Sequence, residues 1–222
     1  MEIELLLREI ENKDWATLIF VLVLGLIAYN RWIFTSQFSD FSKLIFSNKY
    51  IKIYRDPSQL SSWFTLSMAF VQFITFSFII HIFLSYFSTT NLASFRQFAQ
   101  ILNIVCFFIL SKYLIEKIIA ICFDLEEFIN QFHLVKVNYR TYLGLAMLPI
   151  TMILFYNTTI SPYVMYLILS LIVIANVFIY SMIIKIHQKQ LSSYFYYFIL
   201  YLCTFEIAPY YILYKWYVNS GI

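Results

Sequence analysis

The chain has 222 residues, of which 62% are hydrophobic and only 12% are charged, and its mean hydropathy is +0.76. This composition leaves too little polar surface to cover a water-soluble globule, so it excludes an ordinary soluble enzyme and a disordered chain. Three glycines are too few for the glycine-rich loops that bind phosphate in nucleotide enzymes. The net charge of +3 is spread over the segments between apolar runs, which favours a membrane topology signal over a nucleic-acid surface.

The first fourteen residues predict an amphipathic N-terminal tail. Their apolar side chains Ile3, Leu6 and Ile10 recur at helical spacing, and five acidic groups accompany them. This acidity is the reverse of a secretory signal, so we expect the apolar run that follows to remain as a membrane anchor.

Six apolar runs are long and continuous enough to predict membrane-spanning helices rather than the strands of a closed barrel. They predict an all-α polytopic transmembrane bundle, a single domain over residues 1–222, with spans near 15–34, 62–87, 98–123, 142–156, 162–184 and 191–217. The fourth run covers only about 22 Å at the helical rise of ~1.5 Å per residue. Because it contains Gly144 and Pro149, a kink or a partial insertion is expected there.

Basic side chains gather beside alternate connections between these spans. Nine of them flank the first, third and fifth connections: Arg31, Lys43, Lys49, Lys52, Arg55, Lys136, Arg140, Lys185 and Lys189. The positive-inside rule then places these connections in the cytoplasm and both termini on the other side of the membrane.

Two connections predict interfacial amphipathic helices. Leu125, Phe128 and Phe132 lie on the apolar face of the segment 125–135, and Phe38 and Phe41 lie on that of a shorter segment. Each apolar face has two interpretations. It either belongs to a solvated connector, or it docks a partner or lipid headgroups.

The segment 48–57 interleaves aromatic residues with the basic residues Lys49, Lys52 and Arg55. Such a mixture could stack nucleic-acid bases, but beside two predicted spans it is more typical of an anchor for anionic lipids. We therefore expect the lipid bilayer, and not nucleic acid, as its partner.

Glu206 is the most conspicuous ionisable group inside a predicted span, where a charge is costly unless it is paired or hydrated. Pro209 follows three residues later and removes the amide that would have bonded the carbonyl of Phe205. The carboxylate and the freed carbonyl could accept a proton or a cation, with His81 as a partner across the helix interface. Alternatively, Glu206 is protonated or bonded to a neighbouring helix, and the proline only bends the span.

Lys112 and Glu116 are spaced i, i+4 and predict a structural ion pair within the third span. Cys106, Cys122 and Cys203 stand far apart in apolar segments, which indicates neither a disulfide framework nor a metal cluster. Zinc-protease, hydrolase and phosphate-loop motifs do not occur. We therefore expect no metal, no cofactor and no catalytic residue.

The segment 196–209, which closes with Leu213, Tyr214 and Lys215, resembles the C-terminal signature of an integral membrane family of Bacteroidota that is described as a domain of unknown function. The segment 49–57, the region around Asn157 and the pair Glu206 and Pro209 resemble that family too. The resemblance covers most of the chain and implies the inner membrane of a Gram-negative bacterium, so that both termini are expected in the periplasm. It implies no reaction.

Three functions remain open. The first is a non-catalytic accessory or assembly subunit of a larger inner-membrane complex for secretion or envelope biogenesis, since the connections are too short for a soluble catalytic domain. The second is a small proton- or cation-coupled transporter that uses Glu206. The third is a membrane-embedded lipid-modifying enzyme, whose acid and base would have to be Glu206 and His81.

Overall fold

The structure is a computed structural model that describes residues 13–44, 53–54, 62–87, 92–122, 126–157, 161–186 and 215. Within these ranges the chain is helical and no strand occurs, which confirms the all-α class. The helices are α1 (Asp14–Ile33), α2 (Thr35–Ser42), α4 (Trp63–Phe87), α5 (Phe95–Cys122), α6 (Glu126–Tyr156) and α7 (Pro162–Ile186). All of the predicted span 191–217 except Lys215, and the predicted tail up to residue 12, lie outside the described residues.

Three described helices are long and apolar enough to cross a membrane: α1, α4 and the part of α7 from Pro162 to Met182. The predicted spans 15–34, 62–87, 98–123 and 162–184 coincide with α1, α4, α5 and α7 to within a few residues. The apolar runs therefore located these helices correctly, whereas a total of six spans goes beyond what the described residues show.

The fourth predicted span differs most from expectation. Residues 142–156 are the second half of α6, which runs without interruption over 31 residues, or about 46 Å. The segment 125–135 is therefore not a separate helix on a surface, because residues 126–135 form the beginning of the same helix. Neither glycine nor proline occurs between residues 126 and 143 to stop the helix, and Pro149 lies inside it without ending it.

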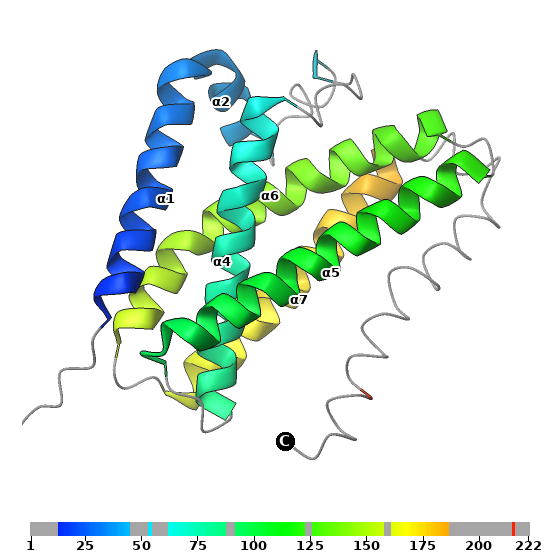
Figure 1. The fold of residues 1–222 in the computed structure, drawn as a ribbon. Coiled ribbons are helices and arrows are strands. Elements are labelled where there is room, and N and C mark those ends of the chain that lie inside the picture. Colours follow the sequence, from blue (N-terminus) through cyan, green and yellow to red (C-terminus); the bar gives the residue numbers. More distant parts are fainter. Residues whose placement is uncertain are drawn as a thin grey trace, which may run out of the picture.

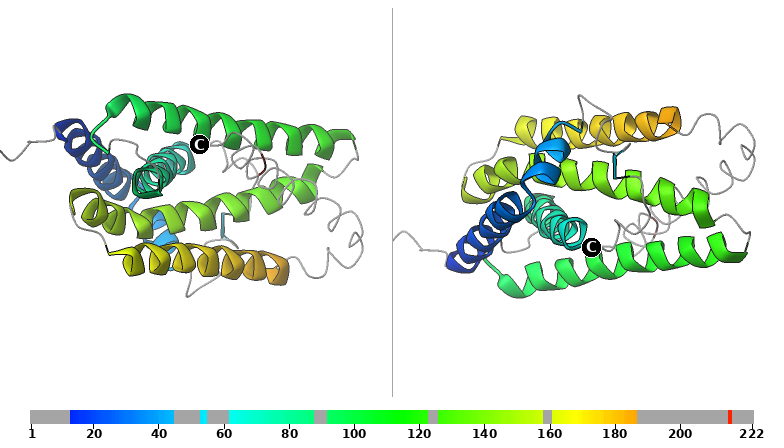
Figure 2. Two further views of the ribbon diagram at one scale, coloured as in Figure 1. Left: turned by 90° about the horizontal axis from the view of Figure 1, so that it is seen from below. Right: turned by 90° about the horizontal axis from the view of Figure 1, so that it is seen from above.

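Helix α4 lies at the centre of the bundle. In Figure 1, α1 and α4 stand side by side, and α5, α6 and α7 cross α4 obliquely. Viewed along α4, as in Figure 2, α5 covers one side of α4, α6 covers the opposite side, and α7 lies outside α6. The helices alternate in direction, so α1, α5 and α7 end where α4 and α6 begin, at the upper end of Figure 1.

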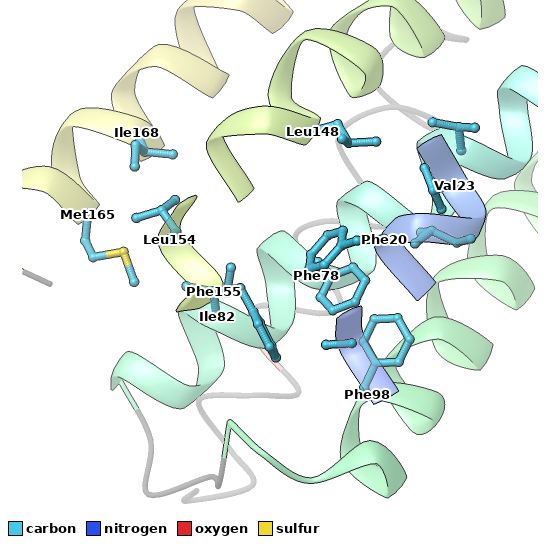
Figure 3. Close-up of a cluster of buried hydrophobic side chains, with 13 residues drawn as sticks. Phe20, Val23, Phe78, Ile82, Phe98, Leu148, Leu154, Phe155, Met165 and Ile168 are labelled. Carbon is cyan, nitrogen blue, oxygen red and sulfur yellow. The ribbon is translucent and has the colours of Figure 1, made fainter. Parts of the chain in front are cut away.

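The core is rich in aromatic rings because α4 carries apolar side chains around its whole circumference, as a central helix must. Phe78 of α4 lies within 4.4 Å of the Phe20 ring of α1, 4.3 Å of the Phe98 ring of α5 and 5.4 Å of the Phe155 ring of α6, measured between ring centroids. Figure 3 shows the cluster around these rings, to which α7 adds Met165 and Ile168, so five helices meet there. A second cluster, which includes Phe64 and Tyr139, lies nearer the other end of α4.

Gly144 sets the distance between α4 and α6. A Cβ atom built on Gly144 would lie 3.0 Å from the Cα atom of Gln72, so the two backbones approach as closely as the missing side chain allows. Beside this contact, the Thr141 hydroxyl donates a hydrogen bond of 2.9 Å to Oε1 of Gln72. On the other side of α4, the Ser67 hydroxyl donates a bond of 2.9 Å to Oδ1 of Asn30 in α1.

The short predicted surface helix around Phe38 and Phe41 corresponds to α2. Its apolar face turns towards the bundle, because Phe41 is 1% exposed and its ring lies 5.7 Å from that of Phe64. Phe41 therefore covers the core of this chain instead of facing lipid or a partner.

Candidate functional site

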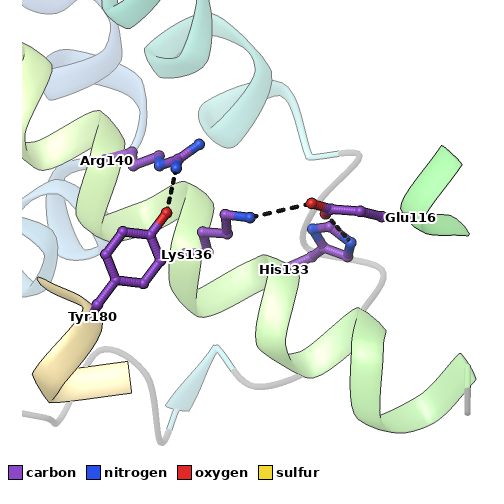
Figure 4. A network of polar contacts seen from close by, with 5 residues as sticks. All are labelled: Glu116, His133, Lys136, Arg140 and Tyr180. Carbon is purple, nitrogen blue, oxygen red and sulfur yellow. Dashed lines mark hydrogen bonds and ion pairs between the residues drawn. The ribbon is translucent and has the colours of Figure 1, made fainter. Parts of the chain in front are cut away.

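A buried group of ionisable side chains lies between α5 and α6. Glu116 of α5 contacts two side chains of α6: its Oε2 lies 2.9 Å from Nε2 of His133, and its Oε1 accepts a hydrogen bond of 3.3 Å from Nζ of Lys136. All three side chains are at most 5% exposed. Figure 4 shows the carboxylate held between the imidazole and the ammonium group. We call these three residues the Glu116 cluster.

Helical spacing brings the cluster together. Cys122 ends α5 and Glu126 begins α6, so the two helices turn back on each other within a few residues. Glu116 lies on the inner face of α5, and His133 and Lys136 are three residues apart on one face of α6. One turn beyond Lys136, Nη2 of Arg140 donates a hydrogen bond of 2.7 Å to the Tyr180 hydroxyl of α7. The polar contacts therefore join α5, α6 and α7 in sequence.

Aromatic rings border the cluster. The Tyr113 ring meets the His133 ring edge to face at a centroid distance of 5.4 Å, and Nζ of Lys136 lies 5.9 Å from the centroid of Phe132. A deeply buried carboxylate needs a counter-charge and a hydrogen-bond donor within the protein, and Lys136 supplies both to Glu116. The arrangement is therefore suited to fastening helices together. Within the described ranges, no three His, Cys, Asp or Glu side chains are grouped as a metal ion would need.

Sequence reasoning singled out Glu116 but not these partners. The sequence pattern places Lys136 beside a cytoplasmic connection and residues 125–135, which include His133, in a surface segment. The signal that could have found them is the spacing of His133, Lys136 and Arg140, at i, i+3 and i+7 along one helix face. Lys112 lies one turn before Glu116 on α5, and the predicted pairing of Lys112 with Glu116 stays a prediction.

His81 of α4 is fully buried at the end of the bundle where α4 ends. Its ring lies 6.4 Å from that of Trp15 in α1 and 6.1 Å from that of Phe98 in α5, between centroids. The indole nitrogen of Trp15 in turn donates a hydrogen bond of 2.9 Å to the carbonyl of Ala93. Glu206 and Pro209 lie outside the described residues, so their predicted association with His81 stays a prediction.

The predicted docking residues divide into two groups. Phe132 differs from expectation: it is 4% exposed and packs in the core cluster of Phe64 and Tyr139, so it is not available to lipid or a partner. The reason is that this part of α6 is enclosed on nearly every side. The remaining docking residues, for which the structure gives no side-chain description, are Lys49, Lys52, Arg55, Leu125 and Phe128.

These observations define the class of protein: an all-α bundle with three helices capable of crossing a membrane and a buried ion-pair cluster between two long helices. Residues 16–217 match the family described as Domain of unknown function (DUF4271), and the chain belongs to that family. This membership agrees with the resemblance to a domain-of-unknown-function family. Comparisons with curated proteins and with solved structures found no match.

Proposed function

We propose that the chain is a six-span protein of a bacterial inner membrane, with both termini in the periplasm, and that it serves as a non-catalytic accessory or assembly subunit of a larger membrane complex. Outward-facing apolar side chains support the membrane location. Leu22 of α1 is 63% exposed, Phe107 of α5 is 76% exposed and Ile174 of α7 is 68% exposed. Apolar surface of this extent on several helices is suited to acyl chains or to partner helices.

Exposed aromatic side chains at the two ends of the bundle also support this location. Trp32 and Trp63 are each 80% exposed at one end, and Tyr86, Tyr156 and Tyr163 are exposed at the other. Trp63 and Tyr86 stand 23 residues apart on α4, which corresponds to about 35 Å. This spacing suits rings at the two interfaces of a hydrocarbon layer about 30 Å thick.

The distribution of basic residues supports the orientation. The connection from α1 to α4, at the end marked by Trp32 and Trp63, includes Lys43, Lys49, Lys52 and Arg55, whereas the connection from α6 to α7 has no basic residue. The positive-inside rule assigns the first connection to the cytoplasm. Thiol labelling of a cysteine introduced at Asn157 from the periplasmic side checks this orientation, and labelling from the cytoplasmic side alone would contradict it.

One observation favours a subunit over a catalyst. The buried charged side chains of the Glu116 cluster contact one another across α5 and α6, and Arg140 continues these contacts to α7. Groups arranged in this way stabilise a scaffold whose outer helix faces stay available to other proteins.

The proposed role is tested by isolating the tagged chain from native membranes in mild detergent and comparing the co-purified proteins with an untagged control. We expect at least one membrane protein in a stoichiometric amount, because an accessory subunit depends on its complex. Recovery of the chain alone, even after crosslinking in the membrane before solubilisation, would contradict the proposal.

A proton- or cation-coupled transporter is the second candidate. The burial of His81 favours it, because an ionisable side chain in a helix able to cross a membrane often marks an ion pathway. Glu206→Gln, which removes the charge and keeps the shape, is then expected to abolish transport without unfolding the protein. Full transport by this variant, measured in proteoliposomes, would exclude Glu206 as the coupling site. Glu206 and His81 would also be the acid and base of a lipid-modifying enzyme, and that function stays a prediction.

A further inference from the structure

One face of α5 is exposed along nearly the whole helix, and its residues follow one another at alternating intervals of four and three. We call this face the α5 seam; its members are Arg96, Gln100, Asn103, Phe107, Leu110, Leu114, Lys117 and Ile121. The opposite face, which includes Phe98 and Glu116, is buried against α4 and α6. Because α5 forms an outer layer of the bundle in Figure 2, the seam faces away from the other described helices.

The spacing of the seam is that of a helix-packing surface. An average interval of 3.5 residues is the heptad repeat, through which two helices pack along a left-handed supercoil. The 3.6-residue turn gives the same spacing to any helix that is exposed along one face, so the polar side chains of the seam have to discriminate between lipid and a second helix. The apolar part of the seam is strongly exposed, with Phe107 at 76% and Leu114 at 56%.

Asn103 indicates that the seam meets another helix rather than lipid. Its Nδ2 donates a hydrogen bond of 2.9 Å to the carbonyl of Ala99, and its side chain is otherwise exposed among the described residues. Acyl chains cannot satisfy the remaining amide N–H and the carbonyl oxygen, whereas a polar side chain on a facing helix can. A single asparagine at a seam position also fixes the register of two helices.

The charges at the ends of the seam discriminate among possible occupants. Arg96 and Lys117 are basic and exposed. A second copy inserted in the same orientation would place like charges opposite each other at both ends, which is unfavourable. The chain's own segment 191–217 also has lysines near both ends in the sequence, Lys189 just before it and Lys215 close to its end. A helix with acidic residues near both ends complements the seam.

We propose that the α5 seam binds a transmembrane helix of a partner subunit. This helix is apolar, carries a hydrogen-bonding side chain at the depth of Asn103, and has acidic residues near its two ends. The inference rests on the proposed role as a subunit of a complex and adds to it the face that is used and the kind of partner that the face fits.

The experiment is photocrosslinking in native membranes with p-benzoyl-phenylalanine in place of Phe107. The matched control carries the same probe in place of Phe178, a phenylalanine of α7 that is 50% exposed. We expect the probe at position 107, and not that at 178, to give one protein adduct whose crosslinked peptide is an apolar helix with acidic flanks. Asn103→Leu should lower the adduct yield by about fivefold, as the loss of one interhelical hydrogen bond implies, and Asn103→Gln should retain it.

Several outcomes would overturn the inference: an adduct of two copies of this chain, an adduct within the chain, lipid adducts alone, equal yields at the two positions, or a yield insensitive to Asn103→Leu. The test is separable from that of the proposed function. If a partner co-purifies in detergent but position 107 gives no adduct with it, the seam assignment fails and the subunit role stands. If nothing co-purifies after crosslinking, both fail.

Discussion

Replacing Glu116 by leucine is expected to lower the free energy of unfolding by about 3–5 kcal/mol, the usual loss when one partner of a buried ion pair is removed. The variant leaves the ammonium group of Lys136 buried at 5% exposure without the carboxylate that it contacts at 3.3 Å. Denaturant unfolding of the purified protein in detergent, followed by tryptophan fluorescence, measures the change.

A second variant shows whether the loss comes from the uncompensated charge. Glu116→Leu combined with Lys136→Met replaces the pair by apolar side chains of similar size, and it should recover most of the lost stability. Lys117→Met, one residue away on the exposed side of α5, is the matched control and should change stability by less than about 0.5 kcal/mol. Equal losses in the single and the double variant would show that packing, and not charge, governs the site.

Gly144→Val is expected to destabilise the protein by about 2–3 kcal/mol, at the upper end of the range for overpacked cores. Its first added carbon would lie 3.0 Å from the backbone of Gln72, so α4 and α6 would have to separate. Their separation would also stretch the hydrogen bond between Thr141 and Gln72. The same unfolding measurement detects the change.

Gly25→Val is the matched control for this prediction. Gly25 is also helical, but a Cβ atom built on it meets nothing within 4 Å. The substitution should therefore be nearly neutral or slightly stabilising, because valine has a somewhat higher helix propensity than glycine. If the two glycine variants unfold alike, the close contact between α4 and α6 does not limit stability.

The helices themselves were largely predictable because long apolar runs determine them locally. The apolar runs of α1, α4 and α7 predict these helices without any knowledge of the helices that pack against them. The continuity of α6 was harder to predict, since its first half alternates polar and apolar residues like a surface helix. That half is buried because α4 and α5 pack against α6, which is a tertiary contact that helical periodicity alone does not reveal.

The candidate site was predictable only in part. Glu116 was conspicuous as a charge within an apolar run, and the nearest basic residue on the same helix, Lys112, was the natural partner to predict. The contacts with His133 and Lys136 depend on the rotation of α5 relative to α6. One sequence does not specify that rotation.

In the proposed membrane location, the Glu116 cluster also bears on how α5 and α6 enter the hydrocarbon layer. Helix α5 contains Lys112, Glu116 and Lys117, and α6 contains His133, Lys136 and Arg140, so either helix alone would carry uncompensated charge into the hydrocarbon. Contact between Glu116 and Lys136 neutralises one charge of each helix. The proposed location therefore predicts that, during synthesis, α5 and α6 move from the translocation channel into lipid together as one helical hairpin, because their charges are then paired.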